Sequence, residues 1–328
     1  TNREGAALLH DALVLLVASI AGNFWWRVHS QLELIAEIEA AGGEVKTSET
    51  APDWLRSWLG PERIRGFHRV HSVGWRDAVD DQFIRITTLG SLDTLVLGNA
   101  KLTSRGYRAL RSLSGLTTLC IAETTLSEAD FEILAELHKI QHLDLDGSTV
   151  DDRSVAILTR EMSLNALNVD STSISDASLR ELAKMPRLAH LNLDQTAITN
   201  DGVRQLAVLR ELESLGLDNT RVTPEAFDTP GGFAKLTCLD ISNTRTTDDS
   251  LFQLRHLPRL EVIFVSGTKV TQAGVDQLKE AIGDRLELEQ VLRTEGMIAQ
   301  GSQGQPVAHP AQAMKTAAAD RISRWIRQ

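Results

Sequence analysis

The chain has few of the residues that build metal sites or cross-link small domains. It contains two cysteines and one tyrosine in 328 residues. Cys120 and Cys238 belong to no CxxC or Cys/His pattern that would indicate structural zinc. Aromatic residues make up only 5% of the chain, so aliphatic side chains must supply most of the core. The composition is that of a soluble globular protein long enough to bury a sizeable core.

The chain also lacks a basic surface and a catalytic motif. Its formal net charge of −10 disfavours a general nucleic-acid binder, which needs cations facing the phosphates. It has no GxGxxG, Walker, HExxH or GxSxG sequence. We therefore predict a protein that is not an enzyme and uses no cofactor or resident metal. A partner protein carrying basic residues fits this charge, and nucleic acid does not.

The N-terminal part has no charged residue between positions 12 and 26, ALVLLVASIAGNFWW. As a helix this stretch would be about 22 Å long, short of the ~30 Å hydrocarbon core of a bilayer. Three interpretations remain open. It is a membrane anchor ending at Trp25 and Trp26, a signal peptide with a small-x-small site at 19–21, or a first helix packed on the domain. We favour the anchor, hence a membrane-anchored or exported protein rather than a cytoplasmic one.

One column of aliphatic residues recurs through the chain at intervals of 24 residues. Each member opens a segment of the form L-x-x-L-x-L, such as LAHLNL at 188–193. Alternating apolar residues over so short a span predict a half-buried strand. The column consists of Leu92, Leu116, Ile140, Leu164, Leu188, Leu212, Leu236 and Leu260.

The residues after each strand repeat as well. Thr196 belongs to a column of Thr and Ser, and Ile198 belongs to an aliphatic column two positions later. A polar pair such as Ser175-Asp176 then supplies the side-chain acceptors that begin a helix. Each row is therefore predicted to be a strand, a turn, a short helix and a return.

These rows resemble leucine-rich repeats of the bacterial short type, LxxLxLxxTxVTDxxLxxLxxLxx, over residues 92–286. The resemblance implies a right-handed α/β solenoid, or horseshoe, with a concave parallel β-sheet and helices on the convex side. In better-known members the hydroxyl column is asparagine, so Thr and Ser are expected to hold the turn instead. The register places Cys120 and Cys238 five strands apart, roughly 24 Å at ~4.8 Å per strand, which predicts two free thiols.

The flanks of the repeats suggest four segments. Residues 1–26 are the membrane anchor or signal segment, and residues 27–66 form a helical N-terminal region whose first helix stops at Gly42-Gly43. Residues 67–290 form the repeat domain, with a degenerate first row, eight rows of 24 residues and a closing strand. Residues 291–328 form a flexible tail whose end could form a short basic amphipathic helix. Trp54 and Trp58 are expected to pack in the cap, and DTPGGF at 228–233 to replace the helix of one row with an irregular segment.

The residues between the strand leucines are expected to face the concave side of the sheet. They form three columns, which begin at Thr94 (first), Val96 (middle) and Gly98 (third) and recur every 24 residues as far as Val262, Phe264 and Ser266. The centre of these columns is acidic and rich in hydrogen-bonding groups. We predict that this surface binds a protein, and its charge favours a basic one. Two alternatives remain: a structural envelope scaffold that makes its contacts through its termini, and a weak cation-binding surface. The predicted binding residues are His142, Asp144, Asp146, Asn168, Asp170, His190, Asn192, Asp194, Asp218 and Asp240.

Overall fold

The computed structural model describes residues 25–48, 68–89, 92–283 and 287–288, together with Ser19, Gly22, Ser57 and Ile64. The chain divides into two compact units, residues 1–291 and 292–328, and the described helices and strands all belong to the first. The predicted tail and its short helix lie outside the described residues. So do Trp54, Trp58 and most of the predicted anchor segment.

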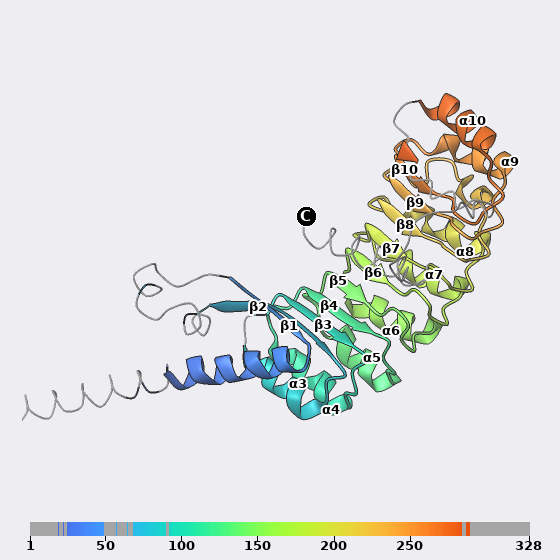
Figure 1. The fold of residues 1–328 in the computed structure, drawn as a ribbon. Helices are drawn as coiled ribbons and strands as arrows, with labels where there is room; N and C mark the ends of the chain where they lie inside the picture. The colour runs from blue at the N-terminus through green and yellow to red at the C-terminus, as the bar shows by residue number, and fades with distance from the viewer. Residues whose placement is uncertain are drawn as a thin grey trace, which may run out of the picture. The chain divides into compact units, whose positions relative to one another are not determined.

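The strands of the unit form one sheet of 11 strands in chain order. The first two strands pair antiparallel, and every later neighbour pairs parallel. From β3 to β10 each strand residue pairs with the residue 24 positions later. In Figure 1 the strands line the inner side of the stacked rows and the helices line the outer side. The strands are β1 (Glu44–Ser48), β2 (Arg69–Arg76), β3 (Thr94–Gly98), β4 (Thr118–Ala122), β5 (His142–Asp144), β6 (Ala166–Asn168), β7 (His190–Asn192), β8 (Ser214–Gly216), β9 (Cys238–Asp240), β10 (Val262–Phe264) and β11 (Glu287–Leu288).

A short helix follows most strands on the outer side (Figure 1). The predicted α/β solenoid is therefore confirmed. The α-helices are α3 (Asp80–Ile86), α4 (Ser104–Ala109), α5 (Glu128–Ala135), α6 (Asp152–Glu161), α7 (Asp176–Leu182), α8 (Asn200–Gln205), α9 (Asp248–Leu251) and α10 (Gln272–Ile282). The 3₁₀ turns are η2 (Thr87–Leu89), η3 (Leu110–Ser112), η4 (Leu206–Val208), η5 (Pro224–Phe227) and η6 (Phe252–His256).

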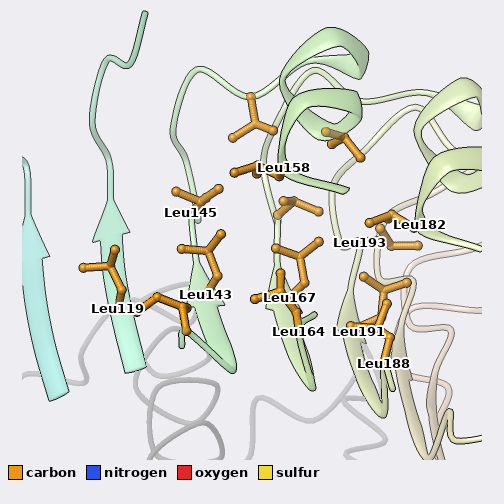
Figure 2. Packing of buried hydrophobic residues seen from close by; sticks show 14 of the residues in the cluster. Leu119, Leu143, Leu145, Leu158, Leu164, Leu167, Leu182, Leu188, Leu191 and Leu193 are labelled. Atoms are coloured by element: carbon orange, nitrogen blue, oxygen red, sulfur yellow. The ribbon is translucent and has the colours of Figure 1, made fainter. Parts of the chain in front are cut away.

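The leucine columns form one continuous core between the sheet and the helices. Figure 2 shows Leu167, Leu191 and Leu193 among buried side chains of successive strands, with Leu158 and Leu182 from the helices packed over them. One row could not bury both of its faces alone, so stacking supplies the apolar contacts of every row. The predicted core columns are confirmed, and Cys120 and Cys238 are free thiols on β4 and β9 as predicted.

Two columns shape the turn that ends each strand. In five consecutive rows, from Thr172 to Thr268, the threonine hydroxyl donates to the carbonyl oxygen three residues earlier, at 2.5 to 2.7 Å. The predicted turn-holding role of this column is thus confirmed. One position before the hydroxyl, the backbone is left-handed in every row, with φ between 50° and 69°. These left-handed residues are Asn99, Glu123, Gly147, Ser171, Gln195, Asn219, Asn243 and Gly267.

On the helix side, an Asp or Asn side chain joins several of the rows to the next row. Asp176, the second residue of a cap pair, accepts from the Thr199 backbone N–H at 2.8 Å and from the Thr199 hydroxyl at 2.6 Å. Asn200 makes the same two contacts with Thr223, both at 2.8 Å. A Cβ on Gly202 would lie 2.2 Å from the Asp176 carboxylate, so glycine leaves room for this bridge. Bridges of this kind are made by Asp80, Asp152, Asp176, Asn200 and Asp248.

The row that contains Pro224 is irregular, as predicted. Its outer segment is the short 3₁₀ turn η5, followed by a loop in which Phe227 and Phe233 pack at 5.0 Å between ring centroids. Pro230, which stands 24 residues after the core residue Leu206, is exposed, whereas Phe233, which stands 24 residues after Leu209, is buried. Pro224 also occupies the position of the bridging carboxylate, so this row cannot make that contact with the next.

A helix of residues 25–40 precedes the sheet and ends where the sequence predicted. Gly42 has φ +78°, and the Gly43 backbone N–H donates to the Ile38 carbonyl at 2.8 Å, which closes the helix. Strand β1 comes next, within residues 27–66, and was not predicted there. Within the described residues, no helix is long and apolar enough to cross a membrane.

Candidate functional site

The three predicted columns lie side by side on the exposed side of the sheet, which we call the sheet face. The parallel register pairs Asp144 with Asn168, Asn168 with Asn192, and Gly216 with Asp240. Neighbouring strands of a sheet are about 4.8 Å apart, so side chains of one column lie one strand spacing from each other. The core leucines between them, such as Leu191, are buried, whereas all ten predicted binding residues are half-buried.

The middle column helps to hold the backbone. The Asn192 side-chain oxygen accepts from the Asp194 N–H at 2.9 Å, and Asn168 accepts from the Asp170 N–H at 3.0 Å. Asp144 and Asp240 accept in the same way from the residue two positions later, at 3.1 and 2.9 Å. Each of these side chains therefore fixes the start of a turn as well as facing solvent.

Gly216 interrupts this column, and Asp194 compensates. With no side chain at Gly216, the Asp218 N–H donates to Asp194 Oδ1 of the previous row at 2.7 Å. A Cβ on Gly216 would lie 2.6 Å from Asn192 Oδ1 and 2.8 Å from Asp194 Oδ1. The glycine thus lets two side chains of the preceding row lean over β8. Asp194 was predicted as a binding residue only, and the structure gives one of its oxygens a backbone partner.

The aspartates of the third column also accept hydrogen bonds from neutral side chains. Asp170 Oδ1 accepts from the Ser171 hydroxyl at 2.8 Å and from the Gln195 amide at 3.1 Å. Asp218 Oδ1 accepts from the Asn243 amide at 2.7 Å. These donors satisfy oxygen atoms without neutralising their charge.

Burial makes ionisation of the sheet-face aspartates unfavourable. Loss of solvent, reinforced by repulsion from Asp240, raises the pKa of Asp194 well above its usual value, although the Asp218 N–H partly opposes this. Loss of solvent is also the main reason that the pKa values of Asp144 and Asp218 are raised. The sheet face therefore concentrates negative charge in a poorly hydrated place.

The histidines and the cysteine of the sheet face do not offset this charge. Burial lowers the pKa of both His142 and His190, so both rings are neutral at pH 7. The Cys120 thiol donates to Asp144 Oδ2 at 3.5 Å, and burial raises its pKa well above the usual value. The thiol is therefore protonated and poorly nucleophilic.

No lysine or arginine occupies the three columns from β3 to β10. On β2, Arg76 stands at the position that pairs with Gly98 of the third column, and its side chain lies over Gly98. Arg76 forms an ion pair with Glu123 at 2.7 Å. Within the described part of the chain, no group of three His, Cys, Asp or Glu side chains is placed to hold a metal ion. The chemistry of the sheet face is thus acceptance of hydrogen bonds by a row of carboxylates.

Comparison with known proteins identifies the family of the chain. A search of curated proteins finds no significant match. Among solved structures, an internalin (InlF) of Listeria monocytogenes is 16% identical, covering 62% of this chain and 69% of its own, with a TM-score of 0.45. Internalin C2 of the same species is 20% identical, covering 62% and 80%, with a TM-score of 0.44. The model of the family described as "Leucine-rich repeat region" matches residues 74–320, well over half of the chain, so the protein belongs to the leucine-rich repeat family.

Proposed function

We propose that this protein is an interaction module that binds a basic segment of a partner protein on its sheet face. One observation carries the proposal: six half-buried aspartates stand in adjacent columns that contain no lysine or arginine. The raised pKa values of Asp144, Asp194 and Asp218 mean that this charge is held at a cost to the free protein. A cationic partner would relieve that repulsion and favour the ionised carboxylates.

The proposal assigns no catalytic role to the sheet face. Leucine-rich repeat solenoids present extended surfaces suited to recognition, and a shallow sheet surface offers no enclosed site for a reaction. The cation alternative is weaker, because the described carboxylates do not converge on one point. A scaffold that makes its contacts through its termini remains the competing proposal, and removal of charge from one face at a time separates the two.

The test compares two triple variants of the full chain that remove the same charge. Asp146, Asp170 and Asp218 become asparagine in the sheet-face variant, which retains side-chain oxygens able to accept hydrogen bonds. Exposed Asp201, Asp249 and Asp276 on α8, α9 and α10 become asparagine in the helix-face control. The probe is a fluorescent hexalysine peptide, whose binding is followed by anisotropy at low and physiological salt.

The sheet-face variant should bind hexalysine about tenfold more weakly than wild type, if each charge contributes roughly 0.5 kcal/mol. The helix-face control should bind nearly as well as wild type. Equal losses in the two variants would show an effect of net charge alone and would reject the sheet face. No loss in either variant would favour the scaffold alternative.

A further inference from the structure

The helix of residues 25–40 has a buried face and an exposed first turn. Leu34, Ile35 and Ile38 are buried in the core that the repeats share. Trp25 and Trp26, by contrast, are 60% and 67% exposed. They are the only aromatic residues among the large apolar side chains found exposed in the described part of the chain. Two adjacent exposed indoles form an apolar surface of the kind that marks a contact with a partner or a membrane.

The sequence before the first turn of this helix indicates what kind of surface the two indoles contact. Residues 12–26 contain no Asp, Glu, Lys or Arg, and Arg27 is the first charged residue after them. Ser19 and Gly22, the other described positions of the stretch, are exposed, and a Cβ on Gly22 would meet no atom within 4 Å. The indoles therefore stand where an uncharged apolar sequence changes into a charged helix. Tryptophan is enriched at such a transition when it coincides with the boundary between bilayer and water.

A bilayer fits this surface better than a second copy of the chain. A stable protein interface buries about 800 Å² on each partner. Two indoles of at most about 250 Å² each supply less than that even when fully covered. A membrane interface needs no matching protein surface, because the apolar ring enters the acyl region while its N–H stays among the headgroups.

We propose that Trp25 and Trp26 lie at the interface of a lipid bilayer and fix the depth of the protein there. The rest of their helix is joined firmly to the repeats. The Gln31 amide donates to the His68 carbonyl at 2.9 Å, and Glu37 forms an ion pair with Arg85 of α3. Residues 26–40 span about 21 Å at 1.5 Å per residue, so the first row is held close to the membrane surface. This inference does not depend on the sheet face.

The experiment measures the depth of the indoles in vesicles. The full chain is reconstituted in phosphatidylcholine vesicles whose acyl chains carry bromine either just below the headgroups or near the bilayer centre. Trp25→Phe/Trp26→Phe removes the two reporters and keeps apolar rings in their place. Trp54→Phe/Trp58→Phe removes two other indoles and serves as the matched control. Circular dichroism confirms that each variant is folded.

Shallow bromine should quench the tryptophan emission of wild type more strongly than deep bromine. This difference should disappear in Trp25→Phe/Trp26→Phe and persist in the control. The proposal is overturned if shallow bromine quenches no more than deep bromine, or if the difference survives loss of both residues. It is also overturned if the chain fails to sediment with vesicles. A dimer that depends on Trp25 and Trp26, without quenching by lipid, would identify a second copy as the occupant.

Discussion

The carboxylate bridge between Asp176 and Thr199 offers a sharp test of what holds neighbouring rows together. Asp176→Ala removes the acceptor for the Thr199 N–H at 2.8 Å and for its hydroxyl at 2.6 Å. A hydrogen bond to a charged group is worth about 1.5–3 kcal/mol. Because this site is only partly buried, we take the low end and expect a loss of about 2 kcal/mol in the free energy of unfolding. That loss lowers the melting temperature by roughly 4–8 °C for a domain of this size.

The next row supplies the matched variant. Asn200 makes the same two contacts with Thr223 through an oxygen and an amide group. Asp176→Asn should therefore keep the bridge and cost less than about 1 kcal/mol, the difference coming mainly from the lost charge at the start of α7. Asp201→Ala is the control on the same side of the fold. It removes an exposed carboxylate paired with Arg204 at 2.7 Å, an interaction worth about 0.3–0.5 kcal/mol.

Urea unfolding followed by circular dichroism gives the free energy of unfolding for wild type and the three variants. If Asp176→Asn is as damaging as Asp176→Ala, then charge rather than geometry stabilises the bridge. If Asp176→Ala is no worse than Asp201→Ala, the bridges contribute nothing and leucine packing alone joins the rows.

Two other predictions concern the turn and the sheet face. Gly147→Ala should destabilise the protein by about 1 kcal/mol in urea unfolding, because the backbone at Gly147 is left-handed, with φ +63°. The new Cβ would meet only ordinary van der Waals contacts, so no clash adds to this cost. Gly147→Asn should cost less, since asparagine occupies the same left-handed position at Asn99, Asn219 and Asn243; equal costs would point to a side-chain clash instead. The raised pKa of Asp194 means that its contribution to stability is fully present below the usual value of 3.8 and is lost as pH rises through the folded pKa. Asp194→Asn should therefore become increasingly more stable than wild type above pH 4 and then level off, and a gap that does not change with pH would contradict this assignment.

Most of the architecture could be predicted because a period of 24 residues fixes it many times over. Every row repeats the same core leucines, so an error in one row is corrected by the others. Strand β1 escaped prediction because EVKTS at 44–48 is short, polar and outside the repeat, and it pairs antiparallel with β2 where the repeats pair parallel. Phe233 was missed, although it stands 24 residues after Leu209 and 24 residues before Leu257, which are both buried.

The candidate site was predicted as a surface, but the internal contacts of that surface were not. The role of Asp194 depends on the missing side chain of Gly216 one row later, which no pattern within a single row reveals. The bridge from Asp176 to Thr199 joins residues of different rows for the same reason. One regularity was available, however. An Asn or Asp stands two positions before the third column in several rows, and this spacing is typical of a side chain that accepts from the backbone.

Side chains of the middle column both hold turns and face solvent, and this limits how the surface can change. Asn168 and Asn192 each hold a turn, so replacement by a residue without a side-chain acceptor alters the scaffold along with the surface. His142 and Ala166 belong to the first column, two residues before the middle column, and hold no turn among the described backbone contacts. A library built to redirect recognition would keep Asn or Asp in the middle column and diversify the first.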